Sequence, residues 1–181
     1  VHVALAELIL DPERVAREGA VSALNWLATP EAQLILHMKV LVGDAEPLVL
    51  GECFRALMAN WPHDAFDLVA SKLSSHDSDL VEQAALALGE SKYPDDFDRM
   101  THAYSHSLSD VKRALLLPIA LLRDDAAFDF VFDVLQNGPV GAAVAAAQAL
   151  EIFQGDEARA ARIREAAAQR GGKVAAAMGM P

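Results

Sequence analysis

Residues 77–89 have the sequence Asp77-Ser-Asp-Leu-Val-Glu-Gln-Ala-Ala-Leu-Ala-Leu-Gly89. An acidic start followed by apolar residues three and four positions apart is typical of a helix that buries one face. The Ala-Leu pair near its end belongs to a set that recurs at nearly constant spacing along the chain: Ala23-Leu24, Ala56-Leu57, Ala87-Leu88, Ala120-Leu121 and Ala149-Leu150. A repeat of this length, with helical apolar patterns inside each unit, predicts stacked helix pairs, each burying its apolar face against its neighbours.

A second apolar row has the same period. Its first members are Leu34, Phe66, Phe97, Phe128 and Ala160. Positions three and seven places later lie on the same side of a helix. They continue the row with His37, Val69, Met100, Val131 and Ile163, and then with Leu41, Leu73, Tyr104, Leu135 and Ala167. Each unit is therefore expected to contain a second helix, with His37 as a partly buried core histidine.

Proline and aspartate mark the helix starts. Thr29-Pro30, Trp61-Pro62 and Tyr93-Pro94 are separated by one repeat each, and Asp124-Asp125 and Asp156-Glu157 occupy the equivalent places later in the chain. Proline suits the first helical turn, and Thr or Asp before it can accept from free backbone N–H groups. We expect second helices at 30–42, 62–74, 94–107, 125–136 and 157–170. First helices are expected at 12–28, 45–60, 79–90, 110–122 and 140–154.

The predicted fold is therefore all-α, a right-handed αα-superhelix (an α-solenoid) without a β-sheet. We expect a single domain over residues 1–181. Its units are predicted at about 11–43, 44–76, 77–108, 109–138 and 139–170. Residues 1–10 are interpreted as the end of a preceding repeat and residues 171–181 as a frayed or interacting tail. Because the chain does not begin with Met, we expect it to be a fragment of a longer protein that has further repeats before residue 1. The apolar surface that is left open at this end of the fragment should then be covered by another part of the protein or by a partner.

Residues 77–89 resemble the first helix of a HEAT-like repeat, especially the short type found in phycobilisome-lyase-related proteins. Pro118 is similar to the proline at a kink common in these repeats. The resemblance spans nearly the whole chain and concerns the scaffold, so it implies an armadillo-type fold with the second helices on the concave side. HEAT-like repeats commonly carry arginine after the valine, where this chain has Glu82. At this position the chain therefore lacks the arginine of the family's usual Asp-to-Arg ladder between repeats.

Charge constrains the function more than any motif. The formal net charge is −11, and the segment from Asp44 to Asp133 carries 17 acidic and 7 basic residues. Nucleic-acid binding relies on Lys and Arg at phosphates, so this composition argues against it. No apolar run is long enough for a transmembrane span, and residues 1–10 lack the features of a signal peptide. We expect a cytoplasmic protein whose partner is a basic or amphipathic protein or peptide; its oligomeric state is left open.

Acidic residues on the second helices lie off the predicted apolar rows. We expect them to form an acidic concave face that binds the partner; the alternative is an ordinary solvated surface. The candidate partner-binding residues are Asp64, Asp67, Asp95, Asp98, Asp125 and Asp129.

The histidines include one pattern with the spacing of metal ligands. Asp98, His102 and His106 have the i, i+4 spacing that can chelate a metal, but no His-Glu-x-x-His motif accompanies them. We expect no bound metal, no cofactor, no catalytic residues and no enzyme activity. The alternatives are weak metal-dependent activity at His102 and His106, and a bilin-lyase-like accessory enzyme, which the resemblance implies. Cys53 is expected to pack in the core, and Trp26 and Trp61 to seal turns between helices.

Overall fold

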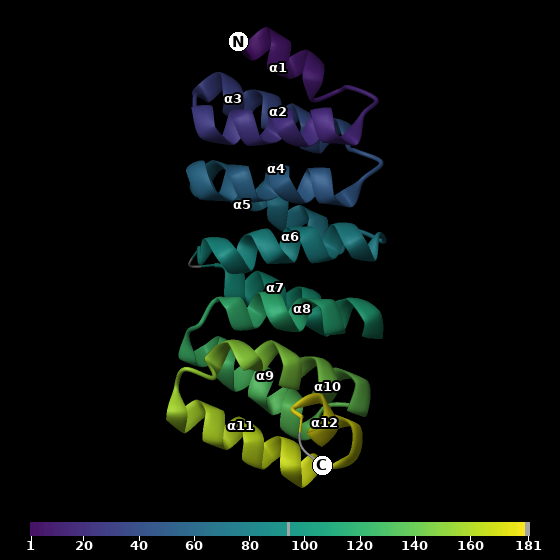
Figure 1. Ribbon diagram of the computed structural model, residues 1–181, viewed down its shortest axis with the longest axis vertical. Helices are drawn as coiled ribbons and strands as arrows, with labels where there is room; N and C mark the ends of the chain where they lie inside the picture. The colour runs from purple at the N-terminus through teal and green to yellow at the C-terminus, as the bar shows by residue number, and fades with distance from the viewer. Residues whose placement is uncertain (94, 180–181) are drawn as a thin grey trace. The chain divides into compact units, whose positions relative to one another are not determined.

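The computed structural model describes residues 1–93 and 95–179, and every regular element in these two ranges is a helix (Figure 1). The helices group into two compact units, Val1–Tyr93 and Pro94–Pro181. Helices pack against neighbouring helices, and no strand occurs in the described ranges, so the predicted all-α repeat class is confirmed. The hand of the superhelix and the single domain stay predictions.

Unit 1 is a stack of first helices with second helices beside it. Helix α4 packs between α2 and α6, while α3 contacts α2 and α4, and α5 contacts α4 and α6. Leu24, Leu57 and Leu88 from the Ala-Leu set are fully buried in this stack. The elements are α1 (His2–Leu8), α2 (Arg14–Leu27), α3 (Pro30–Val42), α4 (Pro47–Asn60), α5 (Pro62–Ser71), the 3-10 helix η1 (Lys72–Ser74) and α6 (Ser78–Ser91).

Unit 2 repeats this arrangement. Helix α10 packs against both α8 and α12, and α9 contacts α8, α10 and α11. Phe128, Val131 and Leu135 of the second row are buried, as is Leu150 of the first. The elements are α7 (Asp96–His106), α8 (Ser109–Leu121), α9 (Asp125–Asn137), α10 (Val140–Ala149), the 3-10 helix η2 (Leu150–Phe153), α11 (Glu157–Arg170) and α12 (Gly172–Ala177).

The predicted helix starts are confirmed where side chains cap the backbone. The Thr29 hydroxyl accepts a hydrogen bond from the Ala32 backbone N–H. The carboxylates of Asp77, Asp124 and Asp156 likewise accept from free N–H groups of the helices they precede, which stabilises each first turn. Pro94, the predicted first residue of the second helix at 94–107, lies outside the described residues.

Helix α3 corrects the second apolar row. Leu34 and Leu41, both predicted to be in the core, are 64% and 65% exposed. Ala32, Leu36 and Val40 are buried in their place. The sequence Pro-Glu-Ala-Gln-Leu-Ile-Leu-His-Met-Lys-Val-Leu-Val places apolar residues on nearly every side of this helix. Its periodicity therefore does not identify the buried face. Leu34, which lies one repeat before the buried Phe66, is on the solvent side of α3.

The expectation that Trp26 seals a turn is also wrong. Trp26 is 86% exposed and so seals no turn, because it lies about 200° around α2 from the buried Leu24. Trp61, the residue between α4 and α5, is half-buried. The tail is not frayed throughout: α12 packs against α10 and α11 and buries Val174. Met180 and Pro181 lie outside the described residues.

Candidate partner-binding surface

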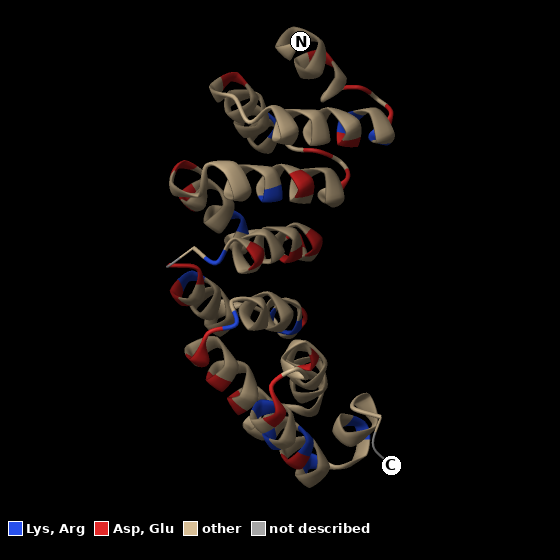
Figure 2. Cartoon of the chain, turned by 60° about the vertical axis from the view of Figure 1, so that its left-hand side comes forward, with Lys and Arg blue, Asp and Glu red and all other residues tan. Residues whose placement is uncertain are grey.

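The six candidate aspartates are all exposed, in early turns of second helices. Figure 2 shows the acidic residues of the chain in red. A helix N-terminus favours negative charge because its free N–H groups carry the positive end of the helix dipole. Asp64 and Asp67 lie in α5 of unit 1, Asp95 and Asp98 lie at the start of α7, and Asp125 and Asp129 lie in α9 of unit 2.

In unit 1, the acidic side of α5 lies next to α3. The Gln33 side-chain amide donates a hydrogen bond of 3.3 Å to the Asp64 carboxylate. Half-buried His37 follows one turn later in α3, with its Nδ1 3.2 Å from the Gln33 carbonyl oxygen. The Gln33 amide carries no charge, so its hydrogen bond does not neutralise the Asp64 carboxylate at the surface.

In unit 2, the α9 aspartates are paired with the last long helix. Asp125 forms an ion pair with Arg159, and Asp129 lies 3.8 Å from Arg162. The guanidinium groups also lie over aromatic rings, with Arg159 4.9 Å from the Phe128 centroid and Arg162 4.7 Å from that of Phe132. Such cation–π contacts hold the arginines against α9. The acidic ridge of α9 is therefore partly neutralised by α11.

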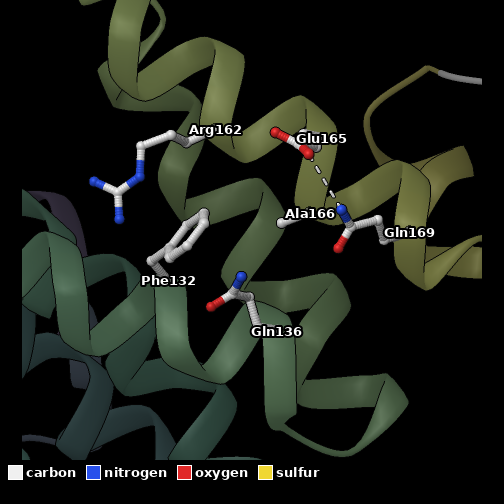
Figure 3. A pocket seen from close by; sticks show the side chains of 6 residues that line it. All are labelled: Phe132, Gln136, Arg162, Glu165, Ala166 and Gln169. Atoms are coloured by element: carbon white, nitrogen blue, oxygen red, sulfur yellow. Dashed lines mark hydrogen bonds between the residues drawn. The ribbon is translucent and has the colours of Figure 1, made fainter.

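A small cleft of about 350 Å³ opens between α9 and α11 (Figure 3). Phe132 and Gln136 come from α9, whereas Arg162, Glu165, Ala166 and Gln169 come from α11. Gln169 donates to Glu165 across one helical turn. Opposite charges and an internal hydrogen bond line the cleft, so it presents no set of converging groups for one class of ligand.

The candidate ligands Asp98, His102 and His106 are not brought together as a group of three. The rings of His102 and His106 are 4.3 Å apart, but His106 Nδ1 lies 2.8 Å from the His102 carbonyl oxygen. A carbonyl oxygen only accepts, so Nδ1 of His106 is the donor in this contact and is engaged with the backbone. In residues 1–93 and 95–179, no three His, Cys, Asp or Glu side chains come together to hold a metal, so Asp98 does not complete a site.

A buried ionic cluster in unit 1 was not foreseen. Arg17 donates two hydrogen bonds, of 2.8 and 2.9 Å, to the Asp44 carboxylate, and Lys39 Nζ lies 2.7 Å from it. The Asp44 and Lys39 side chains are only 2% and 5% exposed. Burial would raise the pKa of Asp44, but the bonds from Arg17, Lys39 and the Glu46 backbone N–H outweigh it and hold that pKa below its usual value. The cluster joins α2 and α3 to the turn before α4.

Cys53 is packed as expected. It is fully buried in α4, and burial raises the pKa of its thiol to about 12. A thiol in this environment is protonated at neutral pH, and the thiolate is the nucleophile in cysteine chemistry. Cys53 is therefore a core residue and not an accessible reactive group.

Within the described part of the chain, no helix has the length and apolar character needed to cross a membrane. Comparison with protein-family models and with curated proteins finds no match for this chain.

Proposed function

We propose that this chain is a HEAT-like, non-enzymatic scaffold that binds a basic or amphipathic segment of another protein through its second-helix surfaces. The observation that carries the proposal is the exposure of all six candidate aspartates on second helices. The overall charge of −11 supports the same kind of partner. The lone cysteine, which cannot form an internal disulfide, is in keeping with a cytoplasmic setting.

Three pairs of aspartates contribute to these surfaces. Asp64 and Asp67 form the α5 acidic surface, and Asp95 and Asp98 form the α7 acidic surface. Asp125 and Asp129, in α9, are partly neutralised by Arg159 and Arg162. Exposed charges of one sign accelerate the encounter with a partner of opposite sign, and salt screens this effect beyond about 10 Å at 0.1 M.

Affinity capture with variants that replace aspartates by neutral asparagines tests the proposal. Immobilised wild-type chain should retain proteins with basic segments at low salt and release them as salt rises. The Asp64→Asn/Asp67→Asn and Asp95→Asn/Asp98→Asn variants should each retain less. Glu82→Gln/Glu90→Gln on the exposed side of α6 changes the net charge equally and serves as the control. Identical retention by wild type and both aspartate variants would contradict the proposal.

A further inference from the structure

Helix α3 carries an apolar stripe on the side facing away from the core. Leu34, Met38, Leu41 and Val42 are 64%, 51%, 65% and 68% exposed. Their spacing along the sequence places them on one side of the helix over about 12 Å. Ala32, Leu36 and Val40 occupy the opposite, buried side. Exposed large apolar residues grouped in this way mark a surface that another molecule covers.

The exposed charged side chains of α3 and α5 have one sign. On α3 and α5, the charged side chains exposed to solvent are Glu31, Asp64 and Asp67, all acidic. The cation of these helices, Lys39, is buried against Asp44 and does not reach the surface. The bond from Gln33 to Asp64 places an acidic group of α5 beside the first turns of the stripe. The apolar row of α3 thus has acidic groups near it: Glu31 on α3 itself and Asp64 on α5.

We propose that the α3 stripe and the acidic groups of α3 and α5 bind an amphipathic helix of a partner protein, with leucine-like residues on the stripe and Lys or Arg beside Glu31, Asp64 and Asp67. The inference rests on the proposed scaffold function and specifies the partner's structure and its place on unit 1. A partner helix with apolar residues at i, i+4 and i+7 matches the spacing of Leu34, Met38 and Leu41. Its basic flanks complement these acidic groups.

Charge also argues against a second copy of this chain as the occupant. A two-fold contact between two α3 stripes would place the same surface on both sides. Glu31, Asp64 and Asp67 of one copy would then approach their counterparts, and like charges in an interface are destabilising. A basic partner has no such conflict.

The test uses a labelled helical peptide, five turns long, with leucines at i, i+4, i+7 and i+11 and lysines elsewhere. Binding to the whole chain is followed by fluorescence anisotropy at low and high salt. The Leu34→Ser/Met38→Ser/Leu41→Ser variant should bind at least 10-fold more weakly than wild type. The control variant replaces exposed apolar residues of unit 2 by serine: Leu108, Leu117 and Val140. Its affinity should be unchanged, and a peptide with glutamates in place of lysines should bind at least 10-fold more weakly.

The possible failures are distinguishable. If the stripe variant binds as wild type does while Asp64→Asn/Asp67→Asn weakens binding, the inference is wrong and the scaffold proposal stands. Failure of wild type to bind the lysine peptide also overturns the inference. Sedimentation showing a wild-type dimer that the stripe substitutions dissociate would assign the stripe to self-association instead of to a partner helix.

Discussion

Replacing Asp44 by alanine should destabilise unit 1 by about 3–5 kcal/mol. The carboxylate accepts two bonds from Arg17 and lies 2.7 Å from Lys39, and a hydrogen bond to a charged group contributes about 1.5–3 kcal/mol. The cost of removing the three charged groups from water offsets part of the stabilisation from these bonds. Removing one partner of a buried pair nevertheless leaves the others as uncompensated charges, for which losses of about 3–5 kcal/mol are typical.

Urea unfolding followed by tryptophan fluorescence measures this loss in unit 1, because both tryptophans, Trp26 and Trp61, lie there. Glu82→Ala removes an exposed carboxylate and should change stability by less than about 0.5 kcal/mol. A loss below about 1 kcal/mol in Asp44→Ala would refute the reasoning.

The same variant has a pH signature. The pKa of Asp44 is lowered in the folded chain relative to about 3.9 in the unfolded chain. Its contribution is therefore fully present above about pH 4 and is lost as the pH falls through the folded pKa. The difference between wild type and Asp44→Ala should be constant from about pH 5 to 8 and shrink below about pH 4.

Three further outcomes are expected. Leu88→Asp places a carboxylate at a fully buried position and should cost at least about 4 kcal/mol in thermal or urea unfolding; wild-type stability would contradict the predicted core. Cys53 should react with a thiol reagent at about pH 8 only after urea is added, since its thiol is buried with a pKa of about 12, and rapid labelling of the native chain would oppose this. Chain purified without added metal should contain no stoichiometric zinc, iron or manganese by elemental analysis; one ion per chain, lost in His102→Ala, would restore the metal-site hypothesis.

Most helix positions could be predicted because two independent signals coincide. Each unit must bury the same faces against its neighbours, so the Ala-Leu pairs recur where Leu24, Leu57 and Leu88 are fully buried. Asp124 and Asp156 cap the helices they precede. Helix α3 could not be placed in phase, because its apolar residues occur on both its core side and its solvent side.

The candidate surface was only partly predictable. Exposure of Asp64 and Asp98 follows from their position off the apolar row. The pairs of Asp125 with Arg159 and Asp129 with Arg162 join residues far apart in the sequence, so they depend on how α9 and α11 pack. The sequence does contain an indication of the Asp44 cluster. Lys39 lies in an otherwise apolar helix, and a lysine is rarely buried without an acidic partner.

The association rate of a captured partner, measured from low to high salt, tests the central claim most directly. Asp64→Lys/Asp67→Lys and Asp95→Lys/Asp98→Lys should each slow association and flatten its salt dependence, while circular dichroism stays helical. Glu82→Lys/Glu90→Lys makes the same charge change on α6 and should keep most of the wild-type rate. An association rate that is equal in all four proteins and insensitive to salt would contradict binding through the acidic second-helix surfaces.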